Sequence, residues 1–219
     1  MKIVIQCAGS KNPSAGHFMT AAGRRIKFIA RPDIAPRSAE FLFARPDDES
    51  DQNGRSWRDL VVDYNKRLGS NPFGLVPAYL LYSNDAYRAL VSRYGSESVF
   101  VLSAGWGLIR SDFLTPWYDI TFKLDADAYK RRRRGDIYSD FHYLTDSNEE
   151  VMFFGGKDYL PFFCQLTDSV RARRIVFYNS RITPSVPGCV LKRYETTMRT
   201  NWHYACARDF AGGKIDATD

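Results

Sequence analysis

Four short apolar runs, each followed directly by small or polar residues, constrain the fold of this chain most strongly. The runs are residues 2–7, 98–102, 151–154 and 174–178. Continuous apolar runs of this length are typical of strands that are buried on both faces of a sheet. The sequence therefore predicts an α/β fold of the Rossmann-like layered type, with a mainly parallel sheet covered by helices.

Amphipathic helix patterns lie between these runs. An apolar stripe of Leu60, Val61, Tyr64 and Leu68 follows Ser56, a good helix cap, and Gly69 is expected to end that helix. A second stripe over residues 87–94 ends at Gly95. A third helix pattern begins near Lys157. The alternation of strand and helix supports the layered fold.

Length and composition predict a single domain over residues 1–219. The chain has 219 residues, of which 44% are hydrophobic, which is enough for one large core. Residues near 20–55 and near 123–148 interrupt the strand–helix pattern, and we interpret both stretches as insertions that shape access to a ligand.

Several classes of protein are excluded or disfavoured. The longest apolar runs are too short to cross a bilayer, and the first residues lack the pattern of a signal peptide, so we expect a cytoplasmic protein without membrane contact. Four scattered cysteines predict no disulfide framework. The chain shows neither the spacing of a zinc site nor a phosphate-binding loop of the triphosphate-hydrolysing type, and we expect no metal and no cofactor.

The positive charge of the chain is unevenly distributed. The net charge is +6, and the excess lies near the two ends and in one cluster of adjacent cations: Lys130, Arg131, Arg132, Arg133 and Arg134. Such a cluster is either a solvated helix flank or a contact for phosphates, and the basic balance favours a nucleic-acid backbone.

The carboxyl ends of the strands carry the candidate site, because ligands bind at that edge of open α/β sheets. After the first run, Cys7, Gly9, Ser10 and Lys11 place a thiol and an amine together. Lys11 is suited to hold a phosphate or, if buried, to act as a nucleophile. The alternative is that Cys7 fills the core and that Lys11 points to water.

Three further motifs follow other strand ends. They contribute Ser103, Gly105, Trp106 and Gly107, then Trp117, Tyr118 and Asp119, and finally Gly156 and Tyr159. We expect the glycines to allow close approach of a ligand and the tryptophans to stack on a base. Asp119 is the best candidate for a general base or for a carboxylate that stabilises a developing cation. The alternative is an ordinary turn with Trp117 in the core.

The order of these motifs resembles the YaaA-like superfamily, which includes peroxide-stress proteins and the catalytic domain of archaeosine synthase. The resemblance lies in Cys7-x-x-x-Lys11, in residues 102–108 followed by Pro116-x-Tyr118-Asp119, and in Gly155-Gly156-x-x-Tyr159. It implies an α/β core with a cleft for nucleic acid or a modified nucleobase, and it implies a nucleophilic role for Lys11.

The combined hypothesis is a DNA glycosylase that flips out a modified base and releases it, in DNA repair or in defence against phages. Asp119, Lys11 and Ser10 would be catalytic, and the residues of the arginine cluster would hold the DNA backbone. Two alternatives stay open: a DNA-binding stress protein without catalysis, and an enzyme that acts on free nucleotides.

Overall fold

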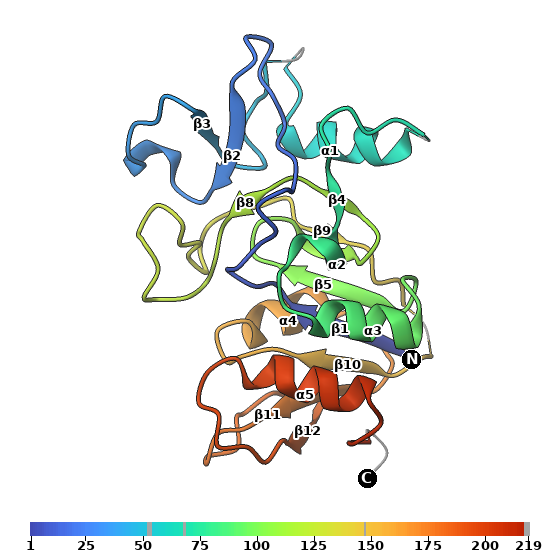
Figure 1. The fold of residues 1–219 in the computed structure, drawn as a ribbon. Helices are drawn as coiled ribbons and strands as arrows, with labels where there is room; N and C mark the ends of the chain where they lie inside the picture. Colours follow the sequence, from blue (N-terminus) through green and yellow to red (C-terminus); the bar gives the residue numbers. More distant parts are fainter. Residues whose placement is uncertain (52–53, 68, 147, 217–219) are drawn as a thin grey trace.

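The structure, a computed structural model, describes residues 1–51, 54–67, 69–146 and 148–216. Among these residues the main sheet has seven strands in the order β12-β11-β10-β1-β5-β6-β9 (Figure 1). Its strands are β1 (Lys2–Gln6), β5 (Val99–Ser103), β6 (Gly107–Arg110), β9 (Phe141–His142), β10 (Val151–Phe154), β11 (Arg174–Tyr178) and β12 (Cys189–Arg193). Strands β5 and β6 pair antiparallel, and the other neighbours pair parallel. The predicted α/β fold with a mainly parallel sheet is therefore confirmed, and all four apolar runs form central strands.

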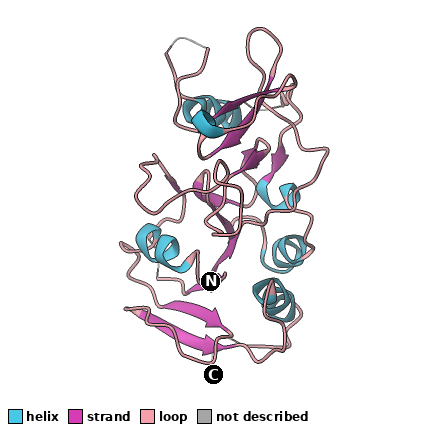
Figure 2. Ribbon diagram, turned by 90° about the vertical axis from the view of Figure 1, so that its left-hand side faces the viewer, coloured by secondary structure: helices cyan, strands magenta, loops and turns pink. Residues whose placement is uncertain are grey.

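Helices cover both faces of this sheet (Figure 2). The helices of the described residues are α1 (Trp57–Lys66), α2 (Ala78–Leu81), α3 (Ala86–Tyr94), α4 (Leu160–Leu166) and α5 (Trp202–Ala211), with a 3₁₀ turn η1 (Pro32–Ile34). Helix α4 lies on one face of the sheet and α3 and α5 lie on the other, whereas α1 lies away from it (Figure 1). The ring of Phe153 stacks on Phe163 of α4, with the centroids 4.3 Å apart. The next residue, Phe154, packs on the opposite face against Phe210 of α5. Adjacent side chains of one strand thus point into two separate layers, as the pleat requires.

Local signals explain where the helices begin and end. Ser56 and Asp59 form a capping box at the start of α1, and Gly95, with φ +81°, ends α3. Helix α1 ends at Lys66, before the predicted stop at Gly69, and Leu68 of the predicted stripe lies outside the described residues. Helix α4 begins three residues after Lys157. Among the described residues, no helix has both the length and the apolar character needed to span a membrane.

The stretch near residues 20–55 builds a separate small sheet. Strands β2 (Arg25–Ile29) and β3 (Phe41–Ala44) pair in parallel, and β8 (Tyr118–Asp119) pairs with the other edge of β2. Figure 1 shows these strands together with α1 at the end of the molecule farthest from β11 and β12. A two-stranded ribbon of β4 (Val76–Pro77) and β7 (Leu114–Thr115) completes the strands of the described residues. Strand β8 therefore brings Asp119 between the small sheet and the carboxyl edge of the main sheet.

The stretch near residues 123–148 does not lie apart from the main sheet. Its strand β9 pairs with β6 and extends the sheet at that edge. The backbone around Arg131 pairs with Thr121, which follows β8. This second stretch therefore runs along the same side of the molecule as Asp119.

Candidate functional site

A cavity of about 730 Å³, which we call the main cavity, opens at the carboxyl end of β1. Residues 7–11, which follow β1 directly, line it on one side. Asp119 and Lys130 line it on another side, and Tyr159 and Tyr204 also contribute. The three residues predicted to be catalytic, Ser10, Lys11 and Asp119, therefore share one cavity, together with Cys7 and Gly9.

Lys11 is held in place by its own backbone and by aromatic rings. Its backbone forms an isolated bridge with Tyr82, which fixes the loop after β1. Its Nζ donates a hydrogen bond to the carbonyl oxygen of Ala8 at 3.2 Å and lies 4.3 Å from the centroid of the Tyr118 ring. Burial lowers the pKa of Lys11 below its ordinary value of 10.5, although the negative charge of Asp119 acts in the opposite direction. The site therefore holds an amine that loses its proton more easily than a surface lysine does.

Asp119 forms an ion pair with Lys130, a residue that we predicted to contact the DNA backbone. Its carboxylate lies 3.2 Å from Nζ of Lys130, and Lys130 also contacts Asp127 at 2.9 Å. The hydrogen bond to Asp127 is the main cause that raises the pKa of Lys130, and Asp119 adds to it. Lys130 is therefore a permanent cation inside the cavity, where it holds the Asp119 carboxylate in place.

Buried hydroxyl groups lie beneath the cavity. The thiol of Cys7 is hydrogen-bonded to the hydroxyl of Tyr159 at 3.2 Å, and the hydroxyl of Tyr204 donates to the backbone oxygen of Cys7 at 3.3 Å. Burial raises the pKa of Tyr159 well above 10, so its phenol stays protonated. Cys7 is thus buried in the core and also lines the cavity. Both interpretations of Cys7, as a core residue and as a residue of the site, therefore apply.

The predicted ligand-binding turn after β5 has a structural role instead. Trp106 is fully buried against Phe28 and Phe141, so it presents no ring face to a ligand and is not a stacking platform. Ser103 is also fully buried, and its hydroxyl donates to Tyr118 at 2.8 Å. None of the turn residues 103–107 lines the main cavity.

The glycines of this turn are required by packing. A Cβ on Gly107 would come within 2.6 Å of the backbone of Phe141, and its φ of +90° favours glycine. A Cβ on Gly105 would press against Tyr118 and Ile120. The close approach that these glycines allow is thus between segments of the protein itself.

The two aromatic residues before Asp119 lie outside the cavity lining. Tyr118 is fully buried, and its ring lies under the amine of Lys11. Trp117 is partly buried and stacks on His17, with the centroids 5.7 Å apart. The aromatic residues that do line the cavity are Tyr159 and Tyr204. Tyr159 was predicted to be a site residue and Tyr204 was not. The aromatic segment that follows Asn201 was the sequence signal that could have indicated Tyr204.

The arginine cluster is divided between the interior and the surface. Arg132 is buried and forms a two-pronged ion pair with Asp140, at 2.6 and 2.8 Å, so it is not available to hold DNA. Arg131 donates to the backbone oxygen of Leu124. Arg133 and Arg134 are exposed. The prediction of a single five-residue contact is therefore corrected, because Lys130 and Arg132 are held in ion pairs with Asp119 and Asp140, and only Arg133 and Arg134 are exposed.

A second cavity, of about 390 Å³, adjoins the first one. It lies at the carboxyl ends of β10 and β11 and is lined by Gly156, among others. The backbone N–H of Gly156 donates to Oε1 of Gln6 at 2.6 Å. Tyr159 lines both cavities.

The described residues contain no group of three histidine, cysteine, aspartate or glutamate side chains suited to hold a metal ion. The groups that line the main cavity include the amines of Lys11, Lys123 and Lys130, the carboxylates of Asp119, Asp125 and Asp127, the hydroxyl groups of Ser10 and Tyr159, and the thiol of Cys7.

The chain matches no family model, no curated protein and no solved structure. The resemblance to the YaaA-like superfamily accordingly stays a prediction that rests on its short motifs.

Proposed function

We propose that this protein is a DNA N-glycosylase that releases a base from a nucleotide held in the main cavity. The observation that carries the proposal is that Lys11 and Asp119, an easily deprotonated amine and a carboxylate, line the same cavity. Its volume of about 730 Å³ is in the range of small-molecule sites and suits a nucleoside. A base inside duplex DNA reaches such a cavity only by leaving the stack.

The reaction assigns one proton transfer to each of the two groups. Asp119 takes a proton from a water molecule while the water oxygen bonds to C1′ of the sugar. The bond between C1′ and the base nitrogen breaks, and the base leaves with the electron pair. Lys11 gives its proton to the departing base, and the lowered pKa makes it a better acid than a surface lysine. The negative charge of Asp119 also stabilises the cationic sugar of the transition state.

DNA is favoured as the substrate by the charge around the cavity. Arg133 and Arg134 are exposed on the segment that carries Lys130, and Lys123 lines the cavity itself. Cations in such positions contact phosphates and hold a duplex while one nucleotide is turned out. We place this reaction in the cytoplasm, in repair or in defence against phages with modified DNA.

Measurement of base release tests the proposal. Purified protein is incubated with unmodified and hypermodified DNA, and abasic sites and free bases are measured by mass spectrometry. We expect Lys11→Met and Asp119→Asn each to lower the rate by about 100- to 10,000-fold, the range for loss of a general acid or base.

Matched controls are Lys66→Met and Asp112→Asn, which remove an exposed lysine and an exposed aspartate, each from a surface ion pair. If the wild type and all of these variants bind DNA, and no substrate yields a free base or an abasic site, the protein is a DNA-binding protein without this activity. A covalent complex trapped by borohydride, and lost in Lys11→Met, would replace the assigned acid role of Lys11 with a nucleophilic one.

A further inference from the structure

The second cavity combines cations that have no carboxylate partner. Lys123, Lys157 and Arg199 line it, and no ion pair joins any of them to a carboxylate in the part of the chain that the structure describes. One carboxylate, that of Asp158, lines the cavity as well. With three cations and one carboxylate in its lining, the second cavity keeps a net positive charge for a ligand.

A buried histidine in this cavity lacks hydrogen-bond partners. His203 is 5% exposed, and neither of its ring nitrogens has a partner among the described residues. Burial and, to a smaller extent, the charge of Lys123 lower its pKa to about 3. The imidazole is therefore neutral near pH 7 and offers one N–H donor and one acceptor. A buried polar group without a partner is costly, and a bound oxygen ligand removes that cost.

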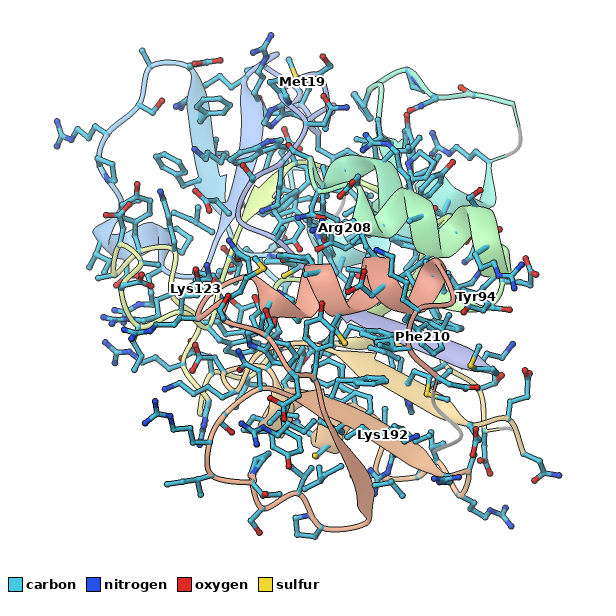
Figure 3. The ribbon with its side chains drawn as sticks, turned by 60° about the horizontal axis from the view of Figure 1, so that its bottom comes forward. Met19, Tyr94, Lys123, Lys192, Arg208 and Phe210 are labelled. Atoms are coloured by element: carbon cyan, nitrogen blue, oxygen red, sulfur yellow. The ribbon has the colours of Figure 1, made fainter. Side chains whose placement is uncertain are left out.

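The first turn of helix α5 also lines the second cavity, through residues 201–203. Asn201 precedes the helix with φ 58°, and its side chain makes no capping bond. The helix has ten residues, and its first N–H groups carry the positive end of the helix dipole. Figure 3 shows Lys123 near the end of α5 that lies opposite Phe210, so a free cation lies beside this helix start. Phosphate groups bind well at such positions.

We propose that the second cavity binds a phosphate group, held by the first turn of α5, His203 and the cations Lys123, Lys157 and Arg199. Lys123, Tyr159 and Asn201 line both cavities, so a phosphate here lies next to whatever occupies the main cavity. This inference rests on the proposed function in one respect. In a DNA glycosylase, the phosphate in the second cavity would belong to the flipped nucleotide or to its neighbour in the DNA. A free nucleotide would present the same chemistry.

Titration with three phosphate compounds tests this site without any catalysis. The chain has three histidines, so the imidazole resonances of His17, His142 and His203 can be assigned and followed by NMR. The probes are inorganic phosphate, a nucleoside 5′-monophosphate and a short single-stranded oligonucleotide. We expect a saturable shift of His203. We also expect Lys123→Gln and Arg199→Gln each to weaken binding by about tenfold, as for a lost charge-assisted hydrogen bond.

Arg37→Gln is the control, because Arg37 is exposed and lies in the small-sheet stretch away from both cavities. Melting temperatures of all variants show that the fold is kept, and His203→Gln, followed by calorimetry, provides a second measure of the same site. Tighter binding of the oligonucleotide than of the monophosphate supports the site as a DNA contact, and equal binding supports it as a nucleotide site.

The proposal is overturned if none of the three probes shifts His203, or if the variants titrate as the wild type does. Phosphate binding without any base release would leave this site intact and refute only the proposed function. Base release that is insensitive to Lys123→Gln and Arg199→Gln, with no shift of His203, would refute only the phosphate site.

Discussion

Lys11 and His203 are buried bases whose pKa values are lowered by the same cause, desolvation. Their surroundings differ. Lys11 has the carboxylate of Asp119 near it and the ring of Tyr118 beneath it, and both favour its charged form. His203 has Lys123 as its charged neighbour, which disfavours the charged form. Lys11 is therefore able to exchange a proton, whereas His203 stays neutral.

The pH dependence of folding stability should reveal His203. Its pKa is 6.5 when unfolded and about 3 when folded, so the unfolded state binds more protons between these values, and stability falls as the pH falls through that window. Between pH 6.5 and pH 4 the titration of His203 should cost the wild type about 3 kcal/mol of its free energy of unfolding, and the variant His203→Gln should not show this loss. Urea unfolding at several pH values measures it. The exposed His142→Gln is the control, and equal slopes for both variants would contradict the assignment.

The pH dependence of base release should depend on Lys130. Lys11 must be protonated to act as the acid, so the rate should fall as the pH rises through the lowered pKa of Lys11. The charge of Lys130 contributes to that lowering. The substitution Lys130→Met should therefore move the alkaline fall of the rate to higher pH, which a profile of kcat/KM measures. Lys66→Met should leave the profile in place, and an unmoved alkaline limb in Lys130→Met would argue against Lys11 as the acid.

At the scale of elements, the segment that follows β8 shows how one run of cations serves several purposes. The backbone N–H of Thr121 bonds to the oxygen of Lys130, and the N–H of Arg132 bonds to the oxygen of Thr121. These bonds tie the segment to the chain that follows Asp119. Lys130 contacts Asp119, Arg132 contacts Asp140, and Arg133 and Arg134 lie on the surface.

Two substitutions within this segment should have opposite effects. Arg132→Met leaves the carboxylate of Asp140, which is 7% exposed, buried without its cation, and should lower the free energy of unfolding by about 3–5 kcal/mol. Arg134→Gln should leave stability within about 0.5 kcal/mol. Chemical denaturation measures both. The double variant Arg132→Met with Asp140→Leu should regain most of the loss, and a loss that the double variant does not regain would mean that Arg132 acts through its packing.

At the scale of the whole molecule, part of the +6 charge lies beside the second cavity. Asp158 lines both the second cavity and a hollow formed by residues 131–134, so the exposed arginines lie near the second cavity. The second cavity in turn shares Lys123 with the main cavity. A path of basic side chains therefore runs from Arg133 and Arg134 past the second cavity to Lys123, which suits a polyanion better than a free base.

Salt dependence of DNA affinity tests this path. Each phosphate contact contributes about −0.9 to the slope of log K against log salt concentration for duplex DNA. Replacing Arg133 and Arg134 together by glutamine should reduce the steepness of that slope by about 1.8. Fluorescence anisotropy over a range of salt concentrations measures it. Replacing Arg37 and Arg88, which are exposed elsewhere, should change the slope less, and an equal change would show that the charge acts without a defined path.

The local patterns in the chain were enough to predict the central strands and the first helices. The runs that became β1, β5, β10 and β11 are apolar at their centres, and burial on both faces of a sheet selects that pattern wherever the chain goes. The convergence of residues 7–11 with Tyr159 also followed from the rule that parallel strands end at one edge. Helix α5 and strand β12 were not predicted, because each mixes apolar with polar or charged residues and β12, a partly exposed edge strand, has no continuous apolar run.

The partners of individual side chains depended on how the chain returns to the site. Trp106 looked free to stack on a base, yet the small sheet places Phe28 against it. Lys130 and Arg132 looked equivalent in the sequence, yet Asp119 and Asp140 give them different functions. The burial of a hydrophobic run is driven by its exclusion from water, which acts in the same way in every fold. An ion pair or a ring contact, in contrast, requires one particular neighbouring side chain. That neighbour is set by the three-dimensional packing of distant segments, and no local pattern contains it.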